Sequence, residues 1–390
     1  MEPLLPPMSG ALRDLALELT RAAAALEGVL HPISRQAVAG LARRAASYYS
    51  NLIEGHDTHP RDLEAALRRK LARDPALRAR QLEARAHVEV HALLDDRLAR
   101  EAELDPASAG FLAWLHRELY GRMPEAYRVL RVAGGGEAEV VPGGFREREV
   151  EVGAHVAPHH RAVPALLARF GEVYGMRSRG GLERVVAAAA AHHRLLWIHP
   201  FLDGNGRVAR LASHAFLARA GVAGGGLWSI ARGLARRRSE YLAALAAADE
   251  PRRGDLDGRG NLTAAGLSDF CELFLGSALD QVRFMAGLLD LPGLSARVLA
   301  YAERRAARGE LRPGAGLLLR EALLRGEVPR GDAPRVLGLR ERTARKVVAD
   351  LAAEGLLTST TPKGPLRLAI TAEAAPWYFP QLYPPAVEQS

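Results

Sequence analysis

Apolar residues recur at helical spacing along most of the chain, with alanine and leucine gathered on one side. The helical stretches cover residues 11–30, 34–52, 60–100, 183–197, 207–220 and 236–249. Proline favours the first helical position, so we expect one long charged helix to begin at Pro60 and to continue to about residue 100. The pattern predicts a mainly α-helical protein.

Two segments depart from this periodicity. Residues 142–146 and 149–153 form short alternating runs bounded by glycine, which predicts a small β-hairpin. Residues 249–261 are rich in charge and glycine, so they form either a solvated linker or a lid.

The pattern changes after Pro292. Two short helices are expected at 314–324 and 332–337, a tight turn at 338–340 and a third helix at 341–354, followed by a strand, a turn and a strand. This order resembles a winged helix-turn-helix domain. In such a domain the third helix would present basic residues to a DNA groove, and the turn would form the wing. Those residues are Arg342, Arg345, Lys346 and Lys363. Docking of a protein stays an alternative to DNA binding.

Composition indicates the number of domains and the cellular location, but it says little about the function. The 390 residues allow two or three domains, and the net charge of +8 is the excess of 50 arginines and 3 lysines, spread along the chain, over 45 acidic residues. The single cysteine, Cys271, excludes a disulfide framework within one chain. No run of about 18 apolar residues occurs, and the first residues lack the features of a signal peptide. We therefore expect a soluble cytoplasmic protein that does not contact a membrane.

Residues 198–210 carry the strongest chemical signal. His199-Pro200 ends one helix, and Gly204-Asn205-Gly206 loops into the next, whose first N–H groups can converge on an anion. Arg207 and Arg210 lie three residues apart, on one face of that helix, and can hold phosphate oxygens. Asp203 offers an oxygen ligand for Mg²⁺, and His199 can accept a proton near neutral pH. An ordinary polar turn is the alternative for any one of these residues.

The whole segment resembles the signature of the Fic family, H-P-F-x-D-G-N-G-R-x-x-R, at every specified position. The resemblance implies a helical core with a β-hairpin flap, which transfers AMP from ATP to a hydroxyl side chain of a target protein. By the same resemblance His199 is the general base and Asp203 the Mg²⁺ ligand. The loop from Gly204 to Gly206 cradles the α- and β-phosphates. Arg207 and Arg210 hold the β- and γ-phosphates.

A second match lies upstream. The run from Ser50 to Gly55 fits the family's inhibitory pattern of Ser or Thr, three residues, then Glu-Gly. In relatives with this motif the glutamate pairs with the second arginine, here Arg210, and denies it to the γ-phosphate. Glu54 would then act as an internal inhibitor. A surface helix that ends at Gly55 is the alternative.

The resemblance extends to two further parts of the chain. The hairpin would be the flap that receives the target segment as an added strand, with docking residues Phe145, Arg146, Val150 and Val152. The helix at 236–249 would border the adenine, with Tyr241 and Asp249 as candidate contacts. A core tyrosine is the alternative for Tyr241.

We expect three domains: residues 1–104 with the inhibitory helix, residues 105–290 with the Fic-type core, and residues 291–390 with the winged helix. Three candidate functions follow. The first is an autoinhibited protein adenylyltransferase that uses ATP and Mg²⁺ and modifies a Ser, Thr or Tyr hydroxyl of a target or of itself. The second is the reverse reaction, in which Glu54 activates water and AMP is removed. The third is a nucleotide-sensing transcriptional regulator that binds DNA. The family resemblance also implies a homodimer.

Overall fold

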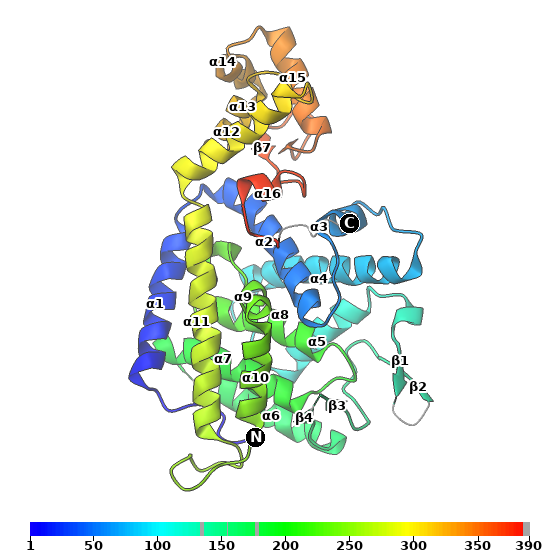
Figure 1. The fold of residues 1–390 in the computed structure, drawn as a ribbon, viewed down its shortest axis with the longest axis vertical. Coiled ribbons are helices and arrows are strands. Elements are labelled where there is room, and N and C mark those ends of the chain that lie inside the picture. Colours follow the sequence, from blue (N-terminus) through cyan, green and yellow to red (C-terminus); the bar gives the residue numbers. More distant parts are fainter. Residues whose placement is uncertain (133–135, 154, 176–178, 385–390) are drawn as a thin grey trace. The chain divides into compact units, whose positions relative to one another are not determined.

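The computed structural model describes residues 1–132, 136–153, 155–175 and 179–384. The described chain is mainly helical, with three small antiparallel sheets. Contacts group it into two compact units (Figure 1). One contains residues 1–24, 46–223 and 229–281, and the other contains 25–45, 224–228 and 282–390.

The N-terminal helices and those of the central region have the following bounds: α1 Gly10–Glu27, α2 Pro32–Ile53, α3 Pro60–Leu67, α4 Pro75–Arg100, α5 Ala109–Tyr120, α6 Val163–Tyr174, α7 Gly181–Ile198, α8 Asn205–Arg219, α9 Ile230–Arg236, α10 Arg238–Asp249 and α11 Ala264–Leu288. Short 3-10 turns occur at Glu125–Tyr127, His160–Ala162 and Gly224–Gly226. Strands β1 (Val129–Val132) and β2 (Gly136–Glu139) pair, and so do β3 (Glu151–Val152) and β4 (His155–Val156).

Helix α7 is the centre of the first unit. Its alanine run from 187 to 191 is buried on every side, because small side chains let α6 and α8 approach its backbone closely. Helix α8 in turn contacts α4, α5 and α9. The loop between α7 and α8 is therefore held by helices on both of its sides.

The prediction of one long charged helix from residue 60 to about residue 100 is wrong, because two helices, α3 and α4, occupy this stretch. Arg69 has a positive φ of 60°, which ends α3. The Asp74 side chain then accepts a hydrogen bond from the N–H of Leu77 at 2.7 Å, and Pro75 occupies the first turn of α4. The Asp-Pro pair was a helix start signal inside the charged stretch.

The expected hairpin also differs in detail. Residues 142–144 form a turn without a strand, and the paired strands are β3 and β4, shifted toward the C-terminus. The β1–β2 hairpin was not expected from the sequence. Its exposed charged residues alternate weakly with apolar ones, so the period-two signal is faint.

The second unit holds a compact C-terminal arrangement. Helices α12 (Leu291–Ala307) and α13 (Ala315–Arg325) pack together, followed by β5 (Glu327–Val328), α14 (Ala333–Leu337), α15 (Glu341–Ala353), β6 (Leu357–Thr358), β7 (Leu366–Leu368) and α16 (Ala375–Tyr378). A 3-10 turn covers Arg330–Asp332. The three strands form one antiparallel sheet in the order β5-β7-β6.

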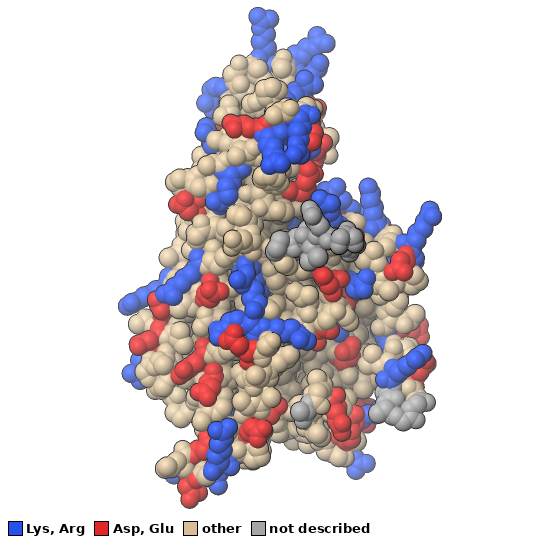
Figure 2. All heavy atoms as spheres, viewed as in Figure 1, with Lys and Arg blue, Asp and Glu red and all other residues tan. Residues whose placement is uncertain are grey.

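The distribution of charge and the character of the helices both bear on function. Figure 2 shows basic side chains spread over the visible face and interspersed with acidic ones, as expected from arginines distributed along the sequence. Within the described residues, no helix combines the length and apolar character that a bilayer crossing requires.

Candidate active site

The segment from His199 to Arg210 joins the end of α7 to the start of α8. His199 takes a left-handed conformation with φ 49°, while its N–H still bonds to the carbonyl of Leu195 at 3.1 Å. Gly204 has a φ of 77°, and a side chain there would place its Cβ 2.5 Å from Cε2 of Tyr120. Glycine is therefore required at 204, both by the backbone angle and by the close aromatic ring.

Asn205 fixes the shape of this loop. Its side-chain oxygen accepts the Phe201 N–H at 2.9 Å, and its amide nitrogen donates to the Phe201 carbonyl at 2.8 Å. Phe201 is fully buried and stacks on the His116 ring with centroids 4.1 Å apart. The Asn205 side chain thus serves the loop itself, and only its backbone remains for a ligand.

The start of α8 can bind an anion. No side chain caps the helix, and its first N–H groups, on Asn205, Gly206 and Arg207, have no intrahelical acceptor. The helix dipole adds a partial positive charge at this end. A phosphate group fits both the hydrogen-bond donors and the charge.

His199 is held as a neutral base. Burial lowers its pKa to about 4, and the nearby charges of His155 and Arg146 act in the same direction. Its Nδ1 lies 3.3 Å from the carbonyl oxygen of Leu196, so Nδ1 carries the proton and Nε2 keeps its lone pair. At neutral pH the ring can therefore accept a proton through Nε2.

Asp203 belongs to a network with Tyr120 and Arg207. The Tyr120 hydroxyl donates to Oδ2 of Asp203 at 2.5 Å and accepts from Arg207 at 2.7 Å. Arg207 also forms an ion pair with Glu83 of α4, whose other oxygen is 2.7 Å from Nδ1 of His56. Burial lowers the Arg207 pKa to about 10, which leaves the guanidinium charged at neutral pH.

Asp203 could also hold a hard cation. Its side chain is 41% exposed, and within the described residues no hydrogen bond is made to its second oxygen, Oδ1. A half-open carboxylate beside an anion site matches the way Mg²⁺ is bound with phosphates and waters. The residues present therefore fit this ion.

Arg210 is occupied from within the chain. Its Nε donates to the Ser50 hydroxyl at 2.8 Å, and its NH2 group donates to the Ser50 carbonyl at 3.0 Å and forms an ion pair with Glu54. A Cβ at Gly206 would overlap Oε1 of Glu54, so the carboxylate lies directly against the loop. Burial alone would raise the Glu54 pKa, but the Arg210 charge outweighs it and lowers that pKa. Glu54 is therefore ionised.

The flap residues divide into two kinds. Arg146 is 4% exposed, with its N–H bonded to the Pro200 carbonyl and its Nε to the His199 carbonyl at 2.7 Å, so it positions the loop instead of facing outward. Phe145 contacts Phe201 at 5.4 Å between centroids. Val152 is 51% exposed on β3, whereas Val150 is half-buried and accepts a hydrogen bond from Ala157.

Tyr241 and Asp249 of α10 each contact a histidine. The Tyr241 hydroxyl is buried 2.8 Å from Nε2 of His192, and burial raises its pKa to about 12. Asp249 contacts Nδ1 of His155 at 2.8 Å, while Nε2 of His155 is 3.0 Å from the Trp197 carbonyl. Although burial opposes it, the Asp249 contact raises the His155 pKa. Here Asp249 holds β4, and Tyr241 lies in the core.

Three residues of this site were missed by sequence reasoning. They are Glu83, His116 and Tyr120, from α4 and α5. His116 accepts the Gly143 N–H at 2.9 Å and lies 3.2 Å from the Asp203 carbonyl, so it joins the flap to the loop. The spacing of these residues gave no local motif, and only the fold brings them to the loop.

Comparison with known proteins agrees with this geometry. Residues 106–217 match the sequence model of the Fic/DOC family. A protein of Drosophila willistoni named protein adenylyltransferase Fic is 41% identical over 87 residues, which span 22% of this chain and 18% of the fly protein. Residues 106–217 are therefore a Fic-type domain, and the rest of the fly protein has no counterpart in this match.

Two solved structures share the fold. A Fic family protein from Desulfovibrio desulfuricans has a TM-score of 0.53 at 20% identity and covers 93% of this chain and 97% of its own. A Fic domain containing signaling protein from Bacteroides thetaiotaomicron has a TM-score of 0.52 at 20% identity, covering 70% of this chain and 95% of its own.

Proposed function

We propose that this chain, with its Fic-type domain, is a protein adenylyltransferase that Glu54 holds in an inactive state. The proposal rests on the complete motif at the α7–α8 loop and on the relatives named protein adenylyltransferase Fic. The observation that carries the inactive state is the capture of Arg210 by Ser50 and Glu54.

The proposed reaction transfers AMP from ATP to a Ser, Thr or Tyr hydroxyl of a target protein. Nε2 of His199 takes the hydroxyl proton as the oxygen attacks the α-phosphorus, and the bond from that phosphorus to the bridging oxygen breaks, releasing pyrophosphate. The N–H groups at the start of α8 bind the phosphates, and Arg207 and Arg210 neutralise the leaving group. Mg²⁺ at Asp203 would supply further charge neutralisation of the phosphates.

The inactive state follows from competition for one guanidinium. Arg210 is 4% exposed, and its Nε and NH2 groups are taken by Ser50 and Glu54. A γ-phosphate that approaches Arg210 would meet the ionised Glu54 carboxylate, which repels it. ATP then binds weakly, or without its terminal phosphate in place.

The reaction class is tested by the position of the label. Purified Glu54→Gly protein is incubated with Mg²⁺ and ATP labelled at the α- or the γ-phosphate, with and without a cell lysate, and proteins are analysed by intact mass. Transfer from α-label alone, with an added mass of one AMP, is expected, and modification of the chain itself would appear in the lysate-free sample. His199→Ala should lower transfer by about 10²- to 10⁴-fold. Transfer of γ-label, or none from either, contradicts the proposal.

A second candidate function concerns the C-terminal segment. The order β5, α14, α15, β6, β7 follows the helix and strand sequence of a winged helix domain. Arg342, Arg345 and Lys346 on α15 are exposed, as is Lys363 between β6 and β7, and Figure 2 shows basic side chains around this part of the chain. These features support DNA binding.

A gel-shift assay over a salt series tests this second function. Each of Arg342→Ala and Lys346→Ala should weaken binding to the DNA upstream of the protein's own gene. Each substitution that removes one ion pair with a DNA phosphate should also reduce the logarithmic salt slope by about 0.9. Arg308→Ala, at an exposed arginine after α12, is the matched control. Absent binding, or binding insensitive to salt, contradicts DNA recognition by α15.

A further inference from the structure

The contact between α4 and α8 contains a continuous row of polar side chains. Glu83, His87, His91 and Asp95 follow one another at intervals of four residues on α4. Arg207, Arg210 and His214 lie at intervals of three and four on α8, which packs against α4. The row begins at the proposed phosphate site and ends at a separate cluster, about 10 Å further along α8.

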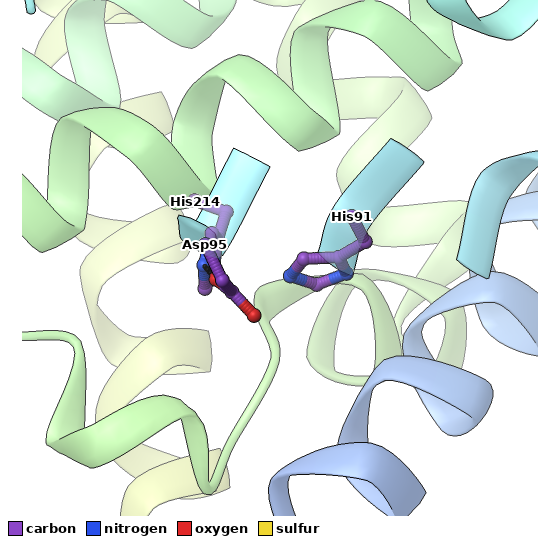
Figure 3. Close-up of side chains that lie close together, drawn as sticks. All are labelled: His91, Asp95 and His214. Carbon is purple, nitrogen blue, oxygen red and sulfur yellow. Dashed lines mark hydrogen bonds and ion pairs between the residues drawn. The ribbon is translucent and has the colours of Figure 1, made fainter. Parts of the chain in front are cut away.

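That cluster consists of His91, Asp95 and His214, whose candidate ligand atoms all lie within 4.8 Å of one another. Nε2 of His214 is 2.7 Å from Oδ1 of Asp95, and the His91 and His214 rings have centroids 4.3 Å apart. Figure 3 shows the His91 ring pointing toward Asp95, which overlaps His214 in this view. Two imidazoles and one carboxylate form a ligand set suited to zinc and similar divalent metals.

The burial of the cluster suits an ion that enters from solvent. His91 is 4% exposed, whereas the side chains of His214 and Asp95 are 14% and 28% exposed. Tetrahedral zinc with ligands at about 2.0–2.1 Å would bring the ligand atoms to about 3.3 Å from one another. This spacing lies between the 2.7 Å that separates Nε2 of His214 from Oδ1 of Asp95 and the 4.8 Å limit for the cluster, and the exposed side leaves a fourth position for water.

A second observation concerns His87, one turn before His91. It is 2% exposed, and neither of its ring nitrogens has a hydrogen-bond partner among the described residues. Burial lowers its pKa to about 3, so the ring is neutral. A buried imidazole without a hydrogen-bond partner costs free energy in a packed helix contact. The contact between α4 and α8 therefore keeps a polar side chain at a position where an apolar one would pack more favourably.

We propose that His91, Asp95 and His214 bind one zinc-class divalent ion that ties α4 to α8. Coordination through Nε2 of His214 requires the lone pair of that nitrogen, so the single proton of the neutral ring then lies at Nδ1 and the contact of Nε2 with Asp95 is replaced by the metal. The ion lies away from the His199 loop, so its role is to hold the helix that carries Glu83 against the helix that carries Arg207 and Arg210. The proposal does not depend on the transferase reaction.

The test is titration of metal-free full-length protein with Zn²⁺, followed by calorimetry. A parallel titration with Co²⁺ is followed by visible absorption, which reports the coordination number of the bound ion. One site per chain is expected, together with a rise in the unfolding temperature. His91→Gln and Asp95→Asn should each weaken Zn²⁺ binding by at least about tenfold. Asp95→Asn keeps a hydrogen-bond acceptor for His214, and circular dichroism verifies that both variants fold.

The matched control is a second cluster near the flap, formed by Glu149, His159 and His160, two of which are exposed. The Glu149→Gln/His159→Gln double variant should keep the site and its affinity. Unchanged Zn²⁺ binding in His91→Gln and Asp95→Asn would overturn the proposal, as would loss of the site in the control variant alone. Absence of any binding to wild-type protein would overturn it too.

Discussion

At the scale of single residues, the central feature is that each motif arginine is already paired with a carboxylate of the chain. Arg210 pairs with Glu54, and Arg207 pairs with Glu83 and Asp203. For the buried Arg207–Glu83 pair, removing one partner costs about 3–5 kcal/mol, because a charge is left without compensation, whereas the Glu54 side chain is 35% exposed and water lowers the cost of removing it. A nucleotide phosphate can bind Arg210 only if it replaces Glu54, and this replacement is the proposed control point.

The pKa of His199 gives a prediction about pH. Because burial lowers this pKa to about 4, from an ordinary value of 6.5, the folded protein keeps the ring neutral where an unfolded chain would take up a proton. In Glu54→Gly protein, the acid limb of kcat/KM for AMP transfer should therefore lie below 6.5. Glu54 raises the His199 pKa, so its removal cannot move the limb upward.

The same shift has a consequence for stability. As pH falls from 6.5 toward 4, the unfolded state binds a proton that the folded state does not, so this group lowers the free energy of unfolding over that window. The His199→Asn variant should show a smaller loss of stability between these pH values. An acid limb at or above 6.5, or an unchanged pH dependence of stability, would contradict the neutral assignment.

At the scale of elements, the shape of the α7–α8 loop depends on Asn205. Asn205→Ala leaves the buried N–H and carbonyl of Phe201 without partners, so we expect a loss of about 2–4 kcal/mol in urea unfolding, together with weaker ATP binding. Asn261→Ala is the control, because the Asn261 side chain is exposed and bonds only to the N-terminal amine among the described residues. Its effect should stay within about 0.5 kcal/mol. Equal effects of the two variants would remove the structural role assigned to Asn205.

Elements with strong periodicity could be predicted from the sequence. The expected helices at 183–197 and 207–220 correspond to α7 and α8 within two residues at each end, because proline and glycine mark their limits. The break between α3 and α4 was missed, since charged residues continue across it and hide the Asp74-Pro75 start signal. Short strands such as β3 and β4 were misplaced because two residues carry almost no pattern.

The candidate site was predictable only where its residues are close in sequence. His199, Asp203, Arg207 and Arg210 come from one loop and one helix turn, so their proximity follows from local geometry. Tyr120 and Glu83 reach Arg207 from helices 87 and 124 residues earlier in the chain. Such contacts depend on how helices pack, and a single sequence does not encode that packing in any local spacing.

At the scale of the whole molecule, nucleotide binding and stability are linked. A ligand that binds only the folded state stabilises it by about 2.7 kcal/mol at a concentration of one hundred times its Kd. The proposed competition between Glu54 and the γ-phosphate predicts that Mg²⁺-ATP raises the unfolding temperature of Glu54→Gly protein by several degrees and that of wild type far less. Differential scanning calorimetry measures both. Equal shifts would mean that Glu54 does not affect nucleotide binding.

The central claim is that Glu54 withholds Arg210 from ATP, and the initial rate of AMP transfer from α-labelled ATP tests it most directly. Glu54→Gly should exceed wild type by about ten- to a hundredfold, since one charge-assisted contact is worth about 1.5–3 kcal/mol. Glu101→Gly removes a glutamate that also follows a helix and pairs with an arginine, Arg97, and should leave the rate unchanged. A Glu54→Gly rate equal to or below that of wild type would contradict the claim.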